Sequence, residues 1–157
     1  MKFNKEIEYM KLCHYQNSFE IYDFFDEEKE FIIIMELCDE TLFHLLCRKQ
    51  KGFSSAEIKN ILLQLNNAFQ RVNYYKISHR DIKLNNILIK YLNKEKTKYK
   101  VLLSDYSISN QLYSITGKFS THAGSQIIMA LEILNDEKYN NKCDLWSLGI
   151  IIYQLYI

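Results

Sequence analysis

The segment "ISHRDIKLNNILIK" at residues 77–90 gathers polar side chains between two apolar stretches. The residues before it have the apolar spacing of an amphipathic helix, and the residues after it have the composition of an apolar strand. Its polar members are, in order, His79, Arg80, Asp81, Lys83, Asn85 and Asn86. A solvated surface turn would explain their polarity but not their order, so the order points to a chemical role.

Composition bounds the class of protein. The chain has 157 residues, 48% of them hydrophobic, which suits one domain with a buried core. Lys plus Arg (20) nearly balance Asp plus Glu (19), and a formal charge of +1 gives no strong field for nucleic acid or an acidic membrane. The charged N-terminus is unlike a signal peptide, and the apolar runs are too short to span a bilayer. We therefore expect a cytoplasmic protein, with the nucleus as the alternative, and no nucleic-acid or membrane partner.

The four cysteines also favour a reducing compartment. Cys13, Cys38, Cys47 and Cys143 are scattered, without a Cys-x-x-Cys pair or a histidine at metal-ligand spacing. We therefore interpret them as buried reduced thiols rather than as zinc ligands.

The first 75 residues contain clear periodic patterns. We expect a short helix at residues 4–13, and an antiparallel hairpin formed by strands at 18–25 and 30–37, the second strand being buried on both faces. Either Asp39 or Thr41 can cap the brief helix that follows.

The clearest helix of the chain lies over residues 53–75. Ser54 and Glu57 have the spacing of a capping box, which satisfies backbone N–H groups at a helix N-terminus. The apolar residues Ile58, Ile61 and Leu65 recur at helical spacing, so this helix is expected to bury one face and to lead into the segment at 77–90.

The second half alternates strands, a long loop and a helix. "NILIK" at 86–90 and "YKVLLSD" at 99–105 predict two strands. Residues 107–128 lack periodicity and form a loop long enough to suggest a function. Residues 143–157 are apolar on nearly every side, which predicts a helix buried in the middle of a domain.

Four motifs in a fixed order identify a family. Residues 79–86 match H-R-D-x-x-x-x-N, in which the Asp accepts the proton of a substrate hydroxyl and the Asn holds a metal ion. "LLSDYSIS" at 102–109, "GSQIIMALEIL" at 124–134 and "DLWSLG" at 144–149 follow. Together these motifs resemble the eukaryotic protein kinases. Lys83, two places after Asp81, resembles the serine/threonine-specific branch.

The resemblance implies an α+β, protein-kinase-like fold that is incomplete. Residues 1–38 would be a remnant of the N-lobe, with helix C, about two strands and the hinge, and residues 39–157 would be the C-lobe through its central buried helix. The sequence has no G-x-G-x-x-G and no preceding strand lysine to grip ATP phosphates. We therefore expect a partial domain with little activity and poor stability, with apolar surface exposed around Trp146 and residues 150–152.

The resemblance also assigns the catalytic residues. Asp81 would be the base or hydroxyl-orienting residue, Lys83 would contact the γ-phosphate of ATP, and Asn86 and Asp105 would hold Mg²⁺. The residue types suit these roles, because carboxylate and amide oxygens are good ligands for Mg²⁺ and a lysine neutralises phosphate as a point charge.

Other positions would bind the adenine ring. By the same resemblance, Met35 guards the back of the adenine pocket, and the backbone from Glu36 to Cys38 is the adenine-binding hinge. Leu88 would form the floor beneath the purine. These residues complete the implied ATP site.

Structural positions follow from the resemblance as well. Glu6, rather than Glu8, would be the helix carboxylate that pairs with the strand lysine in active kinases. His79 would pack beneath the site in a hydrophobic column with Tyr106 and Met10.

Further residues have implied structural or regulatory roles. Asp144 would cap the backbone of the catalytic loop, and Glu132 would pair with an arginine that this sequence does not contain at the expected place. Arg80 would grip a phosphate on the activation loop, because a guanidinium matches phosphate oxygens. Thr121 is the candidate phosphorylation site, with Ser120 as the alternative, and implies an upstream activating kinase.

Substitutions within the motifs leave two functions open. Ser107 replaces a glycine whose freedom in φ helps the segment to switch between states. The retained catalytic set predicts a serine/threonine protein kinase that phosphorylates a protein substrate. The absent lysine and Ser107 motivate the alternative, a pseudokinase or truncated scaffold that binds partners without catalysis.

Overall fold

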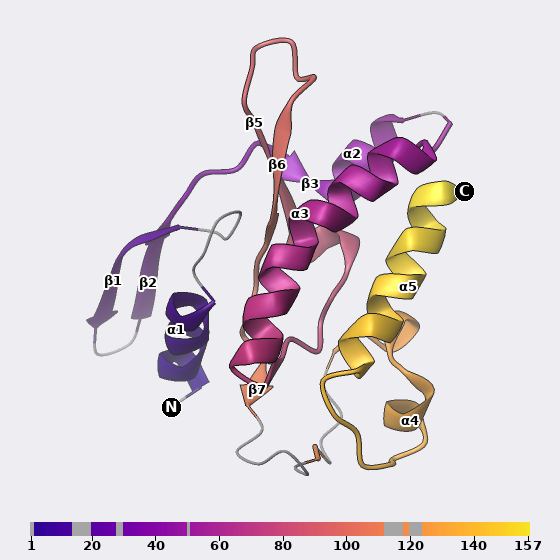
Figure 1. Cartoon of the computed structure of the whole chain (residues 1–157). Coiled ribbons are helices and arrows are strands. Elements are labelled where there is room, and N and C mark those ends of the chain that lie inside the picture. The colour runs from indigo at the N-terminus through magenta and orange to yellow at the C-terminus, as the bar shows by residue number, and fades with distance from the viewer. Residues whose placement is uncertain (1, 14–19, 28–29, 50, 112–117, 120–123) are drawn as a thin grey trace.

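The computed structural model describes residues 2–13, 20–27, 30–49, 51–111, 118–119 and 124–157 (Figure 1). Helices and strands are mixed along the chain, as expected for an α+β fold. In order, the elements are α1 (Lys2–Leu12), β1 (Ile21–Glu27), β2 (Glu30–Met35), β3 (Glu40–Thr41), α2 (Leu42–Arg48), α3 (Ser55–Tyr74), β4 (Ile77–Ser78), η1 (Leu84–Asn86), β5 (Ile87–Tyr91), β6 (Tyr99–Leu103), β7 (Asn110–Gln111), η2 (Gln126–Ile128), α4 (Leu131–Leu134) and α5 (Cys143–Tyr156).

The predicted N-terminal hairpin is confirmed, but its predicted burial is wrong. β1 and β2 pair antiparallel, with Asp23 opposite Ile34 and Phe25 opposite Ile32. Ile32 and Ile34 are each 44% exposed, and Met35 is also exposed. In Figure 1 the hairpin stands apart from the large helices, beside α1. Because β1 and β2 contact mainly each other among the described elements, no second layer covers both faces of β2.

The long helix α3 forms as its sequence predicts. Ser54 Oγ accepts a hydrogen bond from Glu57 N at 3.3 Å, and Glu57 Oε2 accepts one from Ser54 N at 2.8 Å, which completes the capping box. The buried residues of α3 are Ile58, Ile61, Leu65, Ala68 and Val72. They form one apolar face, which fixes the direction in which the chain enters β4.

A main core holds the C-terminal part together. The three-stranded antiparallel sheet β3–β5–β6 packs against α3, and α5 lies along α3 in Figure 1. Thr41 is the N-cap of α2, which decides between the two predicted caps. The buried members of this core are Leu42, Phe53, Ile58, Ile61, Leu65, Ala68, Ile82, Leu84, Ile87, Ile89, Val101, Leu103, Ile151 and Leu155.

Helix α5 is confirmed, but it is buried on one side only. Ile151 and Leu155 are fully buried, whereas Tyr153 and Tyr156 are exposed, as is Trp146 at 42%. The prediction of a helix buried on nearly every side is therefore wrong for the part of the chain that the structure describes. The exposure of Trp146 agrees with the expectation for this surface. The expected exposure of Ile151 is wrong, because Ile151 belongs to the face that packs in the main core.

None of the helices in the described ranges is both long and apolar enough to cross a bilayer.

Candidate active site

The loop between β4 and β5 is anchored from beneath by Asp144 on α5. Asp144 Oδ2 accepts hydrogen bonds from His79 N at 2.8 Å and Ser78 Oγ at 3.1 Å, and Oδ1 accepts one from Arg80 N at 2.8 Å. Burial raises the pKa of Asp144 above its ordinary value, although these hydrogen-bond donors oppose the shift. The backbone contact expected of Asp144 is thus present, and it joins segments 64 to 66 positions apart.

A glycine brings the second half of the chain against this loop. Gly124 has a φ of +112°, and a Cβ atom built on it would lie 2.1 Å from the carbonyl oxygen of Arg80. No side chain fits there without displacing backbone, so glycine is required by both conformation and space. Because these two backbone segments lie so close, the residue after Gly124, Ser125, is within hydrogen-bond distance of Asp81.

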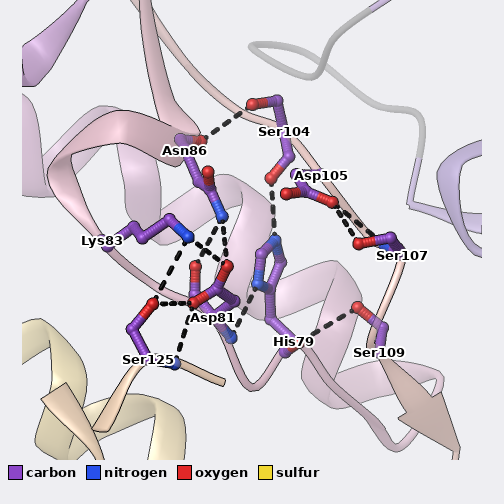
Figure 2. Close-up of polar contacts among 9 residues, drawn as sticks. All are labelled: His79, Asp81, Lys83, Asn86, Ser104, Asp105, Ser107, Ser109 and Ser125. Carbon is purple, nitrogen blue, oxygen red and sulfur yellow. Dashed lines mark hydrogen bonds and ion pairs between the residues drawn. The ribbon is translucent and has the colours of Figure 1, made fainter. Parts of the chain in front are cut away.

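Asp81 is held by donors from three directions (Figure 2). Its Oδ2 accepts hydrogen bonds from Lys83 Nζ at 2.6 Å and Asn86 Nδ2 at 2.9 Å, and its Oδ1 accepts one from Ser125 Oγ at 2.9 Å. Burial of this 7%-exposed residue raises its pKa, but the donors Lys83, Ser125 and Asn86 outweigh burial, so the net pKa lies below the ordinary value. Asp81 is therefore an ionised, oriented carboxylate at neutral pH.

Asn86 joins this loop to the end of β6. Its amide nitrogen donates to the backbone oxygen of Asp81 as well as to the carboxylate, both at 2.9 Å. Its backbone oxygen accepts hydrogen bonds from the backbone nitrogen and the hydroxyl of Ser104 at 2.9 and 3.0 Å. The side-chain oxygen of Asn86 has no hydrogen-bond partner within the described segments. That oxygen is the type of ligand that a hard cation accepts.

His79 lies beneath both loops. Its Nε2 is 3.0 Å from the carbonyl oxygen of Ser104, and its Nδ1 is 3.3 Å from the backbone nitrogen of Asp81. These partners assign the proton to Nε2 and the acceptor role to Nδ1. Burial lowers the pKa of His79, against the opposing charges of Asp144, Asp105 and Asp81. The neutral ring therefore links the two loops.

The expected packing column is present beneath the site. The rings of His79 and Tyr106 lie 4.8 Å apart between centroids. Tyr106 and Met10 belong to one buried cluster, together with Val72 and Ile77. This cluster connects α1 to the end of α3 and to the segment after β6.

Asp105 presents the second carboxylate from the loop after β6. Its backbone has a φ of +65°, in the left-handed region that few residues other than glycine adopt. Oδ1 of Asp105 accepts a hydrogen bond from Ser107 Oγ at 2.5 Å and a weaker one from Ser107 N at 3.3 Å. Figure 2 shows Asp81 and Asp105 on either side of the His79 ring. The two carboxylates thus belong to one region of the molecule, without a hydrogen bond between them.

Sequence patterns did not single out Ser125, Ser104 or Gly124 as site residues. Serine and glycine are ordinary in loops, so no local signal marks the hydroxyl that contacts Asp81. Gly124 could have been a signal, since a glycine that the backbone requires indicates a close approach of two chain segments. It directly precedes Ser125 in the predicted loop of 22 positions.

The whole chain, residues 1–157, matches the family model described as "Protein kinase domain". The chain belongs to the protein kinase family. It is 34% identical to the serine/threonine-protein kinase pakG of Dictyostelium discoideum over 156 residues, which are 98% of this chain and 13% of pakG. It is 30% identical to the serine/threonine-protein kinase TIO of Arabidopsis thaliana over 153 residues, which are 98% of this chain and 11% of TIO.

A third relative, serine/threonine-protein kinase 33 of Mus musculus, is 27% identical over 156 residues, or 96% of this chain and 32% of the relative. The chain therefore spans about a third or less of the length of these curated relatives. The predicted family and the mixed, partial kinase-like fold are confirmed.

The residues expected to bind adenine come from the end of β2, the connection after it, and β5. Glu36 N donates to the backbone oxygen of Glu20 at 2.8 Å, and the Glu36 carboxylate pairs with Lys90 of β5. Cys38 and Leu88 both pack against the cluster that contains Met10. Met35, at the end of β2, is exposed. The connection is therefore tied to β5 directly beside Leu88.

Only some of the residues with an expected regulatory or structural role lie in the described part of the chain. Arg80 Nε donates to the backbone oxygen of Ile108 at 2.7 Å, and the guanidinium lies 5.4 Å from the ring centroid of Phe119. Arg80 thus reaches the segment after β6. Thr121 and Ser120 lie outside the described residues. Glu132 lies in the first turn of α4 and is half-buried.

Glu6 on α1 is close enough to Asp105 to feel its charge. Burial raises the pKa of Glu6, and the negative charge of Asp105 raises it further. The expected role of Glu6 as the partner of a lysine stays a prediction.

Proposed function

We propose that these residues form the catalytic part of a serine/threonine protein kinase, which transfers the γ-phosphoryl group of ATP to a serine or threonine hydroxyl of a protein substrate. The observation that carries the proposal is the Asp81 carboxylate, which is ionised and oriented by Lys83, Asn86 and Ser125. Two of these residues, Lys83 and Ser125, also line a groove. Positioning and charge are what phosphoryl transfer requires of a protein.

In the proposed reaction, Asp81 orients the substrate hydroxyl and accepts its proton. The hydroxyl oxygen forms a bond to the γ-phosphorus, the bond from that phosphorus to the β–γ bridging oxygen breaks, and ADP leaves. Lys83 lies 2.6 Å from Asp81, close enough to neutralise the moving phosphoryl group while it holds the carboxylate.

The oxygen ligands in the site fit Mg²⁺. Asp105 offers a carboxylate, and Asn86 offers a side-chain oxygen without a hydrogen-bond partner in the described segments. No group of three or more His, Cys, Asp and Glu residues is close enough to hold a metal ion among the residues described. A two-ligand site suits Mg²⁺ that is shared with substrate phosphates, where the ion supplies positive charge for the leaving group. ATP and Mg²⁺ are therefore the proposed cofactors.

The protein substrate would lie in a groove beside the residues that hold Asp81. This groove has a volume of about 640 Å³, and both Lys83 and Ser125 line it as well as contacting Asp81. Apolar side chains such as Phe43, Ile127 and Ile128 line the rest. A groove of this kind suits a peptide, with its hydroxyl at the polar end.

The proposed division of the domain is residues 1–38 for the N-lobe part and hinge, and residues 39–157 for the C-lobe part. The main core supports this division, because its buried members begin at Leu42. Met35, Glu36, Cys38 and Leu88 remain the proposed adenine site. Arg80, Thr121 and an upstream activating kinase remain the proposed means of regulation.

The second candidate is a scaffold that binds partners without catalysis. One observation favours it: burial and the negative charge of Asp105 both raise the pKa of Glu6, the residue expected to pair with a lysine. Active kinases use a lysine–glutamate pair to place the phosphates. Turnover by residues 1–157 alone would exclude this candidate.

The test is phosphate transfer from radiolabelled ATP to a broad panel of proteins by the longest gene product that contains residues 1–157. We expect transfer that requires Mg²⁺ and that Asp81→Asn lowers by about 10²–10⁴, the usual contribution of a general base. Glu95→Gln is the control, because Glu95 is exposed in the loop between β5 and β6, at the end of this strand pair opposite Ile87 and Leu103. A well-folded product that transfers no phosphate would contradict the proposal.

A further inference from the structure

One oxygen of Asp105 is engaged by a donor from the same loop. Oδ1 accepts hydrogen bonds from the hydroxyl of Ser107 at 2.5 Å and from the backbone nitrogen of Ser107 at 3.3 Å. Figure 2 shows the Ser107 side chain turned back toward Asp105. The shorter bond is the one made by the hydroxyl, and hydrogen bonds to an ionised acceptor are among the stronger ones.

The two hydrogen-bond donors belong to different parts of residue 107, the backbone and the side chain. The backbone N–H would be present with any residue except proline at position 107, whereas the hydroxyl depends on serine or threonine. Ser107 is exposed, so its side chain has no packing role that would explain its orientation. The hydroxyl bond to Asp105 is therefore a property of this sequence rather than of the loop conformation.

The backbone of Asp105 restricts how its carboxylate can respond. With a φ of +65°, Asp105 has a conformation that few residues other than glycine, asparagine and aspartate adopt readily. The backbone therefore limits how the carboxylate can turn. A cation that binds both carboxylate oxygens must displace the Ser107 hydroxyl from Oδ1. A cation that takes Oδ2 alone need not do so.

We propose that Ser107 is a positioning residue that reserves Oδ1 of Asp105, so that Asp105 offers a divalent cation one oxygen and binds it more weakly than an unhindered carboxylate would. This inference rests on the proposed function, because that proposal assigns the cation to Asp105. The serine thereby sets the cation concentration at which the site fills.

The experiment titrates the 157-residue chain with Mn²⁺ alone and measures the dissociation constant from the relaxation rate of water protons. Ser107→Ala removes the hydroxyl and keeps the backbone N–H, and it should lower the dissociation constant by about three- to tenfold, a modest share of what a hydrogen bond to a charged group contributes. Ser107→Thr keeps the hydroxyl and should restore the wild-type constant. Ser107→Gly is a second variant without the hydroxyl, in case Ser107→Ala folds poorly.

Ser109→Ala is the matched control. Ser109 lies two positions away on the same loop, and its hydroxyl donates to the backbone oxygen of His79 at 3.2 Å instead of to Asp105. This variant should bind Mn²⁺ as the wild type does. Asp105→Asn should lose most of the Mn²⁺ binding, which assigns the titration to this site.

An unchanged or raised dissociation constant in Ser107→Ala and Ser107→Gly would overturn the inference, as would the absence of Mn²⁺ binding in all of these proteins. The result is distinguishable from failure of the proposed function. Tighter Mn²⁺ binding in Ser107→Ala without any phosphate transfer would retain this inference and reject the kinase reaction. Phosphate transfer together with unchanged Mn²⁺ binding in Ser107→Ala would reject this inference and retain the kinase reaction.

Discussion

The loops at residues 77–86 and 104–109 each present one carboxylate, but they fix it in different ways. Asp81 is buried, and its oxygens accept hydrogen bonds from Lys83, Asn86 and Ser125, the last of which is 44 positions away. Asp105 is half-buried, and its side-chain hydrogen bonds come from Ser107. The first carboxylate is thus held by its own loop together with a distant segment, and the second by its immediate neighbour. A single substitution can retune the second without disturbing the first.

The largest expected difference between the loops is in stability. Asp144→Ala removes the acceptor of Ser78 Oγ, His79 N and Arg80 N in a buried place, so the free energy of unfolding should fall by roughly 3–5 kcal/mol. Asp105→Ala breaks hydrogen bonds within its own loop and should cost less than about 1 kcal/mol beyond the backbone penalty of an alanine at positive φ.

Urea unfolding followed by circular dichroism measures both changes. Asp136→Ala is the control for Asp105→Ala, because Asp136 also has a positive φ, of +59°, and shares the backbone penalty of an alanine in that conformation. Equal losses in Asp144→Ala and Asp105→Ala would show that the two loops are held in the same way.

A smaller effect should come from acidification, through the histidine that links the loops. Burial lowers the pKa of His79 in the folded state, so below about pH 6.5 the unfolded chain binds a proton that the folded chain does not. Stability is therefore full above that pH and falls as the pH decreases toward the lowered pKa, by up to about 1.4 kcal/mol for each pH unit.

The measurement is the free energy of unfolding between pH 7.5 and 5.5. His79→Gln should remove the histidine's part of the slope, and the difference from wild type separates it from the carboxyl groups that titrate nearby. A wild-type slope equal to that of His79→Gln would contradict the assignment of a neutral, buried ring.

Local patterns predicted the helices well, because their causes lie within a few residues. The capping box of Ser54 and Glu57 and the apolar spacing of α3 are complete in the sequence, and both occur in the structure. The order of the four motifs was enough to indicate the kinase family. Glu57 and Ser54 needed no distant partner to form their contacts.

Burial was predicted less well, because it depends on distant partners. The apolar runs in β2 and α5 suggested elements covered on all sides, whereas Ile34 and Tyr153 are exposed. An apolar run shows what a segment can bury, but not whether another layer is present to cover it. The hydroxyl of Ser125 beside Asp81 was missed for the same reason, since that contact depends on the approach of Gly124 to Arg80.

The central claim is that the two loops converge on one cation site. The most direct measurement is the line broadening of ¹⁵N–¹H resonances when low concentrations of Mn²⁺ are added to the isotope-labelled chain. The account predicts that the resonances of Asn86 and Asp105 broaden together, while that of Asp136 stays sharp. Broadening at only one of the two loops, or equal broadening at Asp136, would contradict it.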